Sequence, residues 1–160
     1  MASPVQNNQS SQLLVGIDVG STTAKIAVMD AASHEMLMRR YVRHHAQQAN
    51  CLKSLLAELD QRFEGIPMRA ALCGSGGAAL AEALDLPYVQ EVVANSLAVG
   101  ANYPTARTAI ELGGQDAKMI FFKFDNEANC LSVADMRMNG SCAGGTGAFI
   151  DEIATLLKVP

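Results

Sequence analysis

The sequence predicts an α/β protein whose second half repeats the opening of the first half. Strand-like apolar segments alternate with helix-like amphipathic segments along most of the 160 residues. Residues 17–26 align without gaps on residues 110–119, at a constant offset of 93 residues, and Ile, Gly, Ala and Lys are identical in the two copies. A repeat of this length indicates a duplicated domain rather than a solenoid. Apolar residues make up 49% of the chain and charged residues 18%, which is typical of a globular protein.

The first half contains, in order, three strands, a helix, a strand and two helices. Residues 13–19 form a continuous apolar run that ends in a Gly-Ser-Thr turn, and residues 24–29 follow as the second strand of a hairpin. Apolar residues then recur at helical spacing between Leu52 and Phe63, before Gly65 and Pro67 end the helix. The other elements expected are strands at 34–42 and 68–73 and helices at 78–84 and 91–101.

The second half restarts this pattern. Its repeat strand is followed by a strand pair at 117–124 and 130–138, a glycine-rich loop, and a helix at 148–157. We therefore expect a first lobe at 13–106 and the beginning of a second, incomplete lobe at 107–160. Residues 1–12 are polar and rich in Ser, Gln and Asn, so we expect a disordered lead-in there.

Charge and cysteine usage narrow the classes of function. The net charge is −4 and the chain has no Lys/Arg cluster large enough for a nucleic-acid backbone or a lipid surface. The basic stretch at 39–45 is interpreted as the polar face of an edge strand. No apolar run approaches the ~20 residues of a membrane span. With four cysteines, no C-x-x-C pair and no secretory leader, we expect a reducing cytoplasm, where Cys51, Cys73 and Cys130 would be buried apolar fillers.

The duplicated turns suggest a pair of phosphate cradles. Backbone N–H groups in a glycine-containing turn can point at an anion, and a carboxylate at the end of the preceding strand can hold Mg²⁺ through water. Two such turns facing each other would clamp a triphosphate, although a merely structural duplication gives the same pattern. The candidate binding residues are Gly20, Ser21, Thr22, Gly113 and Gly114, and the candidate magnesium ligand is Asp18.

For four residues near these turns the sequence leaves two alternative roles. Lys25 and Lys118 either aim at a phosphate or extend outward from the sheet surface. Gln115 and Asp116 either orient an attacking or metal-bound water or make ordinary hydrogen bonds within the turn.

Cys142 lies between a strand and a Gly-Gly-Thr-Gly loop that leads into a helix. A helix N-terminus lowers a thiol pKa and favours the thiolate that binds metals. One cysteine cannot hold an iron–sulfur cluster, so further ligands would have to come from a second subunit or from later sequence. The loop itself could grip a nucleotide phosphate through Gly144, Gly145, Thr146 and Gly147. It is not a Walker loop, and no G-x-G-x-x-G follows the first strand, which disfavours both of those nucleotide folds.

Three blocks together resemble the BadF/BadG/BcrA/BcrD ATPase family, the activators of 2-hydroxyacyl-CoA dehydratases and their benzoyl-CoA reductase relatives. They are GIDVGSTTAK at 16–25, ELGGQDAK at 111–118 and NGSCAGGTGAF at 139–149, and the likeness extends from Leu13 to the end of the chain. It implies an actin-like ATPase fold of two ribonuclease-H-like lobes, with the first complete and the second truncated.

The resemblance also implies a function. Family members bind and hydrolyse ATP and drive a low-potential electron into a dehydratase or related reductase, with ferredoxin or flavodoxin as the donor. They form homodimers that share one [4Fe–4S] cluster, to which each subunit gives two cysteines. By position in the motifs, Asp18, Gln115 and Asp116 would be catalytic, Lys25 would contact the nucleotide, and Cys142 would be the first cluster ligand.

The sequence departs from the family pattern at two points, and it leaves two alternative functions open. Glu111 stands where the short activators usually show Asp, and the chain ends before the expected second cluster cysteine and adenosine-binding segment. We therefore expect a fragment that is inactive alone and cannot assemble the cluster. A sugar-type kinase of the same superfamily would use the same turns without needing Cys142. A non-enzymatic nucleotide-dependent switch would bind ATP without turnover.

Overall fold

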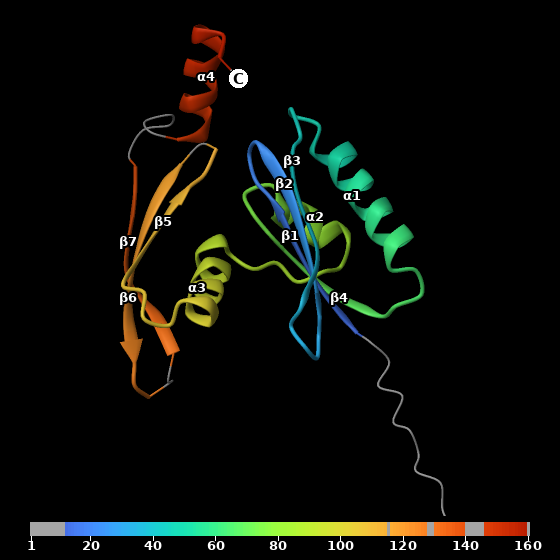
Figure 1. Ribbon diagram of the computed structural model, residues 1–160, viewed down its shortest axis with the longest axis horizontal. Helices are drawn as coiled ribbons and strands as arrows, with labels where there is room; N and C mark the ends of the chain where they lie inside the picture. Colours follow the sequence, from blue (N-terminus) through green and yellow to red (C-terminus); the bar gives the residue numbers. More distant parts are fainter. Residues whose placement is uncertain (1–11, 115, 128–129, 140–145, 160) are drawn as a thin grey trace, which may run out of the picture.

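The computed structural model describes residues 12–114, 116–127, 130–139 and 146–159, and it confirms the α/β class. Two separate sheets lie side by side, joined by a helical connection (Figure 1). The expected lead-in falls almost wholly on residues 1–11, which lie outside the described residues. No helix in the described ranges is long and apolar enough to cross a membrane.

The first sheet has the strand order β3-β2-β1-β4. β1, β2 and β3 are antiparallel neighbours, whereas β4 runs parallel to β1. Beyond β4 a single parallel bridge joins Leu72 to Tyr88, which places a further piece of extended chain at this edge. The strands are β1 (Leu13–Val19), β2 (Thr23–Asp30), β3 (Met36–Arg43) and β4 (Met68–Cys73).

One face of the first sheet forms the main core. Alternate residues of β1 and β2 are buried there, because successive side chains of a strand point to opposite faces. They pack with leucines of α1 (Gln48–Arg62) and with α2 (Gly77–Ala83). Full burial of one such side chain contributes about 1.5–3 kcal/mol. The opposite face carries Asp18 and Lys25.

The second sheet is fully antiparallel, with the order β5-β6-β7. Its strands are β5 (Thr108–Leu112), β6 (Ala117–Asp125) and β7 (Cys130–Met138). α3 (Glu91–Asn102) follows the first sheet in sequence but packs against β7. α4 (Gly147–Leu157) stands at the end of this sheet (Figure 1). Ile120 and Phe122 are buried, whereas Ile110 and Leu112 are about two-thirds exposed.

The expected elements are all present, with bounds within about two residues except at α1, which begins at Gln48, four residues before Leu52. β3 begins at Met36 rather than 34, because residues 31–35 belong to the turn after β2. Asp30 Oδ1 accepts the backbone N–H of Ala32 and of Ser33, and His34 has a positive φ of 59°. The boundary between lobes at 106/107 stays a prediction.

Two expectations about single side chains are wrong. Cys130 is exposed, which contradicts its expected burial, whereas Cys51 and Cys73 are half-buried and Cys51 packs against the main core. Residues 39–43 do lie on the exposed edge strand, but His44 at its end is buried, with 4% of its surface exposed. Its ring is turned towards the first turn, where a backbone carbonyl accepts its hydrogen bond.

Candidate functional site

The two repeated turns share a backbone hydrogen bond. In the first turn, Gly20 N–H donates to the carbonyl of Thr23 over 2.9 Å; in the second, Gly113 N–H donates to the carbonyl of Asp116 over 2.8 Å. These pairs are related by the same offset as the sequence repeat. The duplication is therefore a duplication of turn structure as well as of residues.

The two turns meet at the junction of the two sheets. A Cβ atom placed on Gly114 would lie 2.4 Å from Thr22 Oγ1, so only glycine fits there without a shift of one turn. Between the turns is a small cavity of about 80 Å³, which we call the cleft. Its lining consists of Asp18, Gly20, Ser21, Thr22, Thr23, Lys25, Ser75, Glu91, Glu111, Gly113, Gly114, Asp116 and Lys118.

The first carboxylate of the cleft is paired with the first lysine. Asp18 and Lys25 stand directly opposite each other on β1 and β2, so their side chains project from the same face of the sheet. Lys25 Nζ lies 2.6 Å from Asp18 Oδ2. The other oxygen, Asp18 Oδ1, is buried and has no hydrogen-bond partner.

Gly74 fixes the position of Asp18. It has a φ of +92°, which favours glycine, and an added Cβ would lie 2.3 Å from Asp18 Oδ1 and 2.4 Å from the carbonyl of Val19. Tyr88 Oη donates to the carbonyl of Gly74 over 3.2 Å and so holds this turn from the sheet edge.

The second lysine is surrounded by three carboxylates. Lys118 Nζ is 2.7 Å from Glu91 Oε2, and it is 3.6 Å from both Glu111 Oε1 and Asp116 Oδ2. Desolvation lowers the pKa of Lys118, but the hydrogen bond to Glu91 and the three negative charges outweigh it, so the pKa is raised above its usual value. Glu111 Oε2 is buried without a partner, as Asp18 Oδ1 is in the first copy.

Both lysines line the cleft and are ion-paired with carboxylates there, so neither extends outward from its sheet. Contact of either lysine with a phosphate stays a prediction. The cleft contains four carboxylates and two ammonium groups among its lining residues, so its formal charge is two negative.

The N-terminus of α4 lies against the second turn. Gly147 N–H donates to the carbonyl of Gly113 over 3.0 Å, and Thr146 is fully buried, with no partner for Oγ1. One turn further along, the Arg43 guanidinium of β3 forms a bidentate ion pair with Asp151, whose Nη2–Oδ1 contact is 2.8 Å. This pair connects the edge of the first sheet with α4.

Cys73 is the neighbour of Asp18 on β4. Burial, together with the negative charges of Asp18 and Glu91, raises the pKa of its thiol to about 11. A thiol of this kind stays protonated at neutral pH, and it is not a metal ligand in this state.

Most residues expected from the sequence converge on the cleft. Eight of them line it: Asp18, Gly20, Ser21, Thr22, Lys25, Gly113, Gly114 and Asp116. Thr146 and Gly147 lie beside the second turn without lining the cleft. Gln115, Cys142, Gly144 and Gly145 lie outside the described residues.

Sequence reasoning missed Glu91, Ser75, Gly74 and His44. Glu91 was visible only as the first residue of a helix, and Gly74 and Ser75 only as part of a turn that ends a strand. Their contacts join residues far apart in the chain, so no local pattern marks them.

The oxygens without partners in the cleft belong to Asp18 and Glu111, and carboxylates of this kind fit a Mg²⁺ held through water. No group of three or more His, Cys, Asp or Glu close enough to hold a metal by itself is found in the described ranges.

Comparison with known proteins identifies a family and several relatives. The model of the BadF/BadG/BcrA/BcrD ATPase family matches residues 15–160. The (R)-2-hydroxyglutaryl-CoA dehydratase activating ATPase of Acidaminococcus fermentans is 27% identical over 146 residues, which cover 91% of this chain and 54% of the relative. An uncharacterised protein of Methanocaldococcus jannaschii is 30% identical over 149 residues, covering 92% of this chain and 56% of the relative.

Solved structures show the same fold. Component A of (R)-2-hydroxyglutaryl-CoA dehydratase from Acidaminococcus fermentans superposes with a TM-score of 0.76 at 26% identity, covering 94% of this chain and 56% of that one. The activator of the 2-hydroxyisocaproyl-CoA dehydratase from Clostridium difficile, solved with bound ADPNP, gives a TM-score of 0.69 at 24% identity, covering 92% and 53%. These likenesses confirm the expected actin-like ATPase fold. This chain spans about half the length of the relatives it matches.

Proposed function

This chain belongs to the BadF/BadG/BcrA/BcrD ATPase family, and from that membership we propose that it is the nucleotide-gripping part of an ATP-dependent activator of a 2-hydroxyacyl-CoA dehydratase. The observation that carries the proposal is the pair of matching turns with ion-paired carboxylates, which face each other across one cleft. The activators among its relatives supply the class of partner, a dehydratase component.

The cleft suits a triphosphate accompanied by a metal. Its side chains sum to two negative charges, so a free ATP would be repelled. A divalent cation reverses this balance, because it neutralises phosphate oxygens and carboxylates together. Asp18 and Glu111 would hold Mg²⁺ through water, using the buried oxygens that have no protein partner. Lys25 and Lys118 would then be released from their carboxylates to contact phosphate oxygens.

The cleft is small for a nucleotide. Its cavity measures about 80 Å³, whereas small-molecule sites measure roughly 300–1,000 Å³. We therefore propose that the two sheets separate around the turns when the nucleotide binds. A cleft that opens for its ligand and closes on it is a common hinge device of two-lobed proteins.

Hydrolysis needs a group that orients water near the terminal phosphate. We assign this role to Asp18 with Gln115 and Asp116, as the family motifs imply. Glu91 is an additional candidate, because its carboxylate enters the cleft from α3 and already contacts Lys118. When bound, Mg²⁺ would stabilise the negative charge that develops during phosphoryl transfer.

The activator function requires electron transfer as well as ATP chemistry. We propose that Cys142 contributes to a [4Fe–4S] cluster shared across a homodimer, with ferredoxin or flavodoxin as the donor and a dehydratase or related reductase as the acceptor. A cytoplasmic location belongs to the same proposal. The family resemblance around residues 139–149 supports it.

The proposal is tested by titrating the chain with ATP in a calorimeter, with Mg²⁺ and then with EDTA. We expect binding only when Mg²⁺ is present, and we expect Asp18→Asn to weaken it by about tenfold or more through loss of a metal-positioning charge. Asp60→Asn is the matched control, because Asp60 is an exposed carboxylate on α1, away from the cleft. Equal affinity in Asp18→Asn and in the unaltered chain would place the nucleotide elsewhere.

A further inference from the structure

His44 is anchored to both ends of the first phosphate turn. Its ring atom Nε2 lies 3.0 Å from the carbonyl oxygen of Gly20, and its own backbone N–H donates to the carbonyl of Thr22 over 3.2 Å. The side chain is 4% exposed. One residue at the end of β3 thus holds two of the three carbonyls at positions 20–22.

The contact with Gly20 defines which ring atom of His44 is the donor. A carbonyl oxygen only accepts, so Nε2 must carry a hydrogen in this contact. The other ring nitrogen, Nδ1, is buried and has no partner. Nε2 is therefore the ring atom through which His44 holds the turn.

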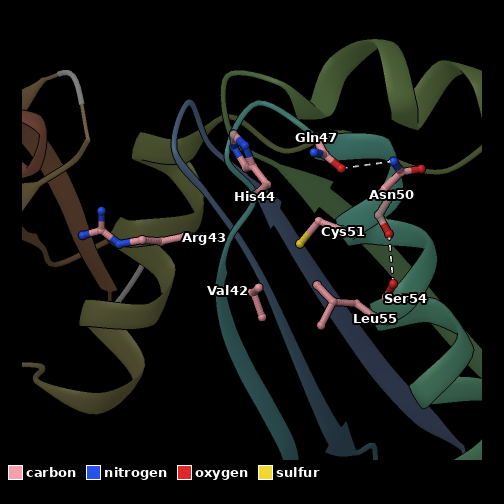
Figure 2. Close-up of a pocket in the computed structure, with 8 residues that line it drawn as sticks. All are labelled: Val42, Arg43, His44, Gln47, Asn50, Cys51, Ser54 and Leu55. Carbon is pink, nitrogen blue, oxygen red and sulfur yellow. Dashed lines mark hydrogen bonds between the residues drawn. The ribbon is translucent and has the colours of Figure 1, made fainter.

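The backbone after His44 is bent to make this arrangement possible. His45 and Ala46 both have positive φ values, 47° and 61°, in the left-handed region that non-glycine residues rarely adopt. The carbonyl of His44 then accepts the N–H of Gln47 over 2.7 Å, at the start of α1. Figure 2 shows His44 at the end of β3, beside Gln47, with Arg43 pointing the other way. Strained backbone of this kind persists only where the surroundings determine it.

The carbonyl contacts also set the direction of the neighbouring amides. In a trans peptide the C=O and the following N–H point in opposite directions, and the described part of the chain has no cis peptide. A Gly20 carbonyl held towards His44 turns the N–H of Ser21 away from His44, and Ser21 lines the cleft. The Thr22 carbonyl, which accepts the backbone N–H of His44, fixes the other end of the turn.

We propose that His44 is a positioning residue that holds the first turn so that the amide of Ser21 faces the phosphates of the nucleotide. This inference rests on the proposed function, since it names the device that prepares that site. His44 does not line the cleft, so it acts through the turn rather than by contact with ATP.

The test compares His44→Gln with His44→Met, two side chains of similar length of which only the first can donate a hydrogen bond to Gly20. Lys53→Met is the control, because Lys53 is exposed on α1. In the nucleotide-free chain we expect amide exchange at residues 21–23 to be about tenfold faster in His44→Met and nearly unchanged in His44→Gln and Lys53→Met. Mg·ATP affinity should follow the same order.

Two results would overturn the role of His44: unchanged exchange at 21–23 in His44→Met, or equal acceleration in both His44 variants. If His44→Met does not fold, His44→Gln is compared with the unaltered chain instead. Faster amide exchange at residues 21–23 in His44→Gln would then contradict the role of the residue as a hydrogen-bond donor. If the unaltered chain does not bind Mg·ATP, the proposed function is contradicted. The exchange measurement without nucleotide still decides whether His44 holds the turn.

Discussion

Gly74 shows how strongly one residue can constrain the cleft. Its positive φ favours glycine, and its closeness to Asp18 leaves no room for a Cβ atom. Each of these two features independently disfavours a side chain at this position. Gly65 offers a matched case, because it has a positive φ of 74° with nothing within 4 Å of an added Cβ.

We predict that Gly74→Ala destabilises the chain by at least about 1 kcal/mol more than Gly65→Ala, because only the first adds a steric clash to the backbone strain. The free energies of unfolding in urea measure the difference. Gly74→Ala should also lose Mg·ATP binding, since Asp18 is displaced. Equal destabilisation by the two substitutions would mean that Asp18 and Val19 can move away freely.

The cysteines give a second prediction at the scale of single residues. Because the pKa of Cys73 is about 11 and its thiol is half-buried, we expect it to react with iodoacetamide far more slowly than exposed Cys130 at pH 7. Its rate should rise about tenfold for each pH unit up to that pKa. Peptide mass spectrometry after timed alkylation at pH 7, 8 and 9 follows both sites. Equal rates at pH 7 would contradict the buried, carboxylate-flanked position of Cys73.

Single residues were also where sequence reasoning was weakest. Asp18, Lys25 and Asp116 were found because each lies in a repeated motif. Glu91 and His44 were not, since their contacts with Lys118 and Gly20 cross from one element to another. Only the folded arrangement shows that these elements meet.

Most helices and strands were predicted correctly from the spacing of apolar residues and from turn residues. β1, β4 and β7 have the predicted bounds, since each is a continuous apolar or alternating run closed by turn residues. The bridge at Tyr88 was not predicted, because a single paired residue leaves no periodicity. The pairing of strands, and the packing of α3 against β7 rather than on the first sheet, likewise depend on the tertiary fold.

The contact between β3 and α4 gives a prediction at the scale of elements. The hydrogen bond from Arg43 lowers the pKa of Asp151 below its ordinary value of 3.8. Because the pKa of Asp151 is lower in the folded state, the contact contributes to stability at pH values above the unfolded-state pKa. This contribution is lost as pH falls through the folded-state pKa. The ion pair therefore connects the first sheet and α4 at neutral pH and releases them in acid.

We expect Arg43→Gln to return the pKa of Asp151 towards its ordinary value, as followed by the carboxyl carbon resonance in an NMR titration. Amide exchange in α4 should become faster at neutral pH in the same variant. Arg39→Gln is the control, because Arg39 is an exposed arginine on the same strand. An unchanged Asp151 titration in Arg43→Gln would show that the ion pair does not form in solution.

For the whole molecule, the two sheets and their turns form a clamp. The first turn is braced by His44 and Gly74, and the second by Asp116 and the N-terminus of α4. Lys25 and Lys118 balance part of the negative charge of the cleft. Duplication of one hairpin thus produces a cleft that neither copy forms alone.

The central claim is that both turns grip one nucleotide, and amide exchange with and without Mg·ATP tests it most directly. We predict simultaneous protection at residues 19–24 and 112–117 when Mg·ATP is added, with both effects abolished by Asp18→Asn. Protection at one turn only, or at neither, would contradict the clamp.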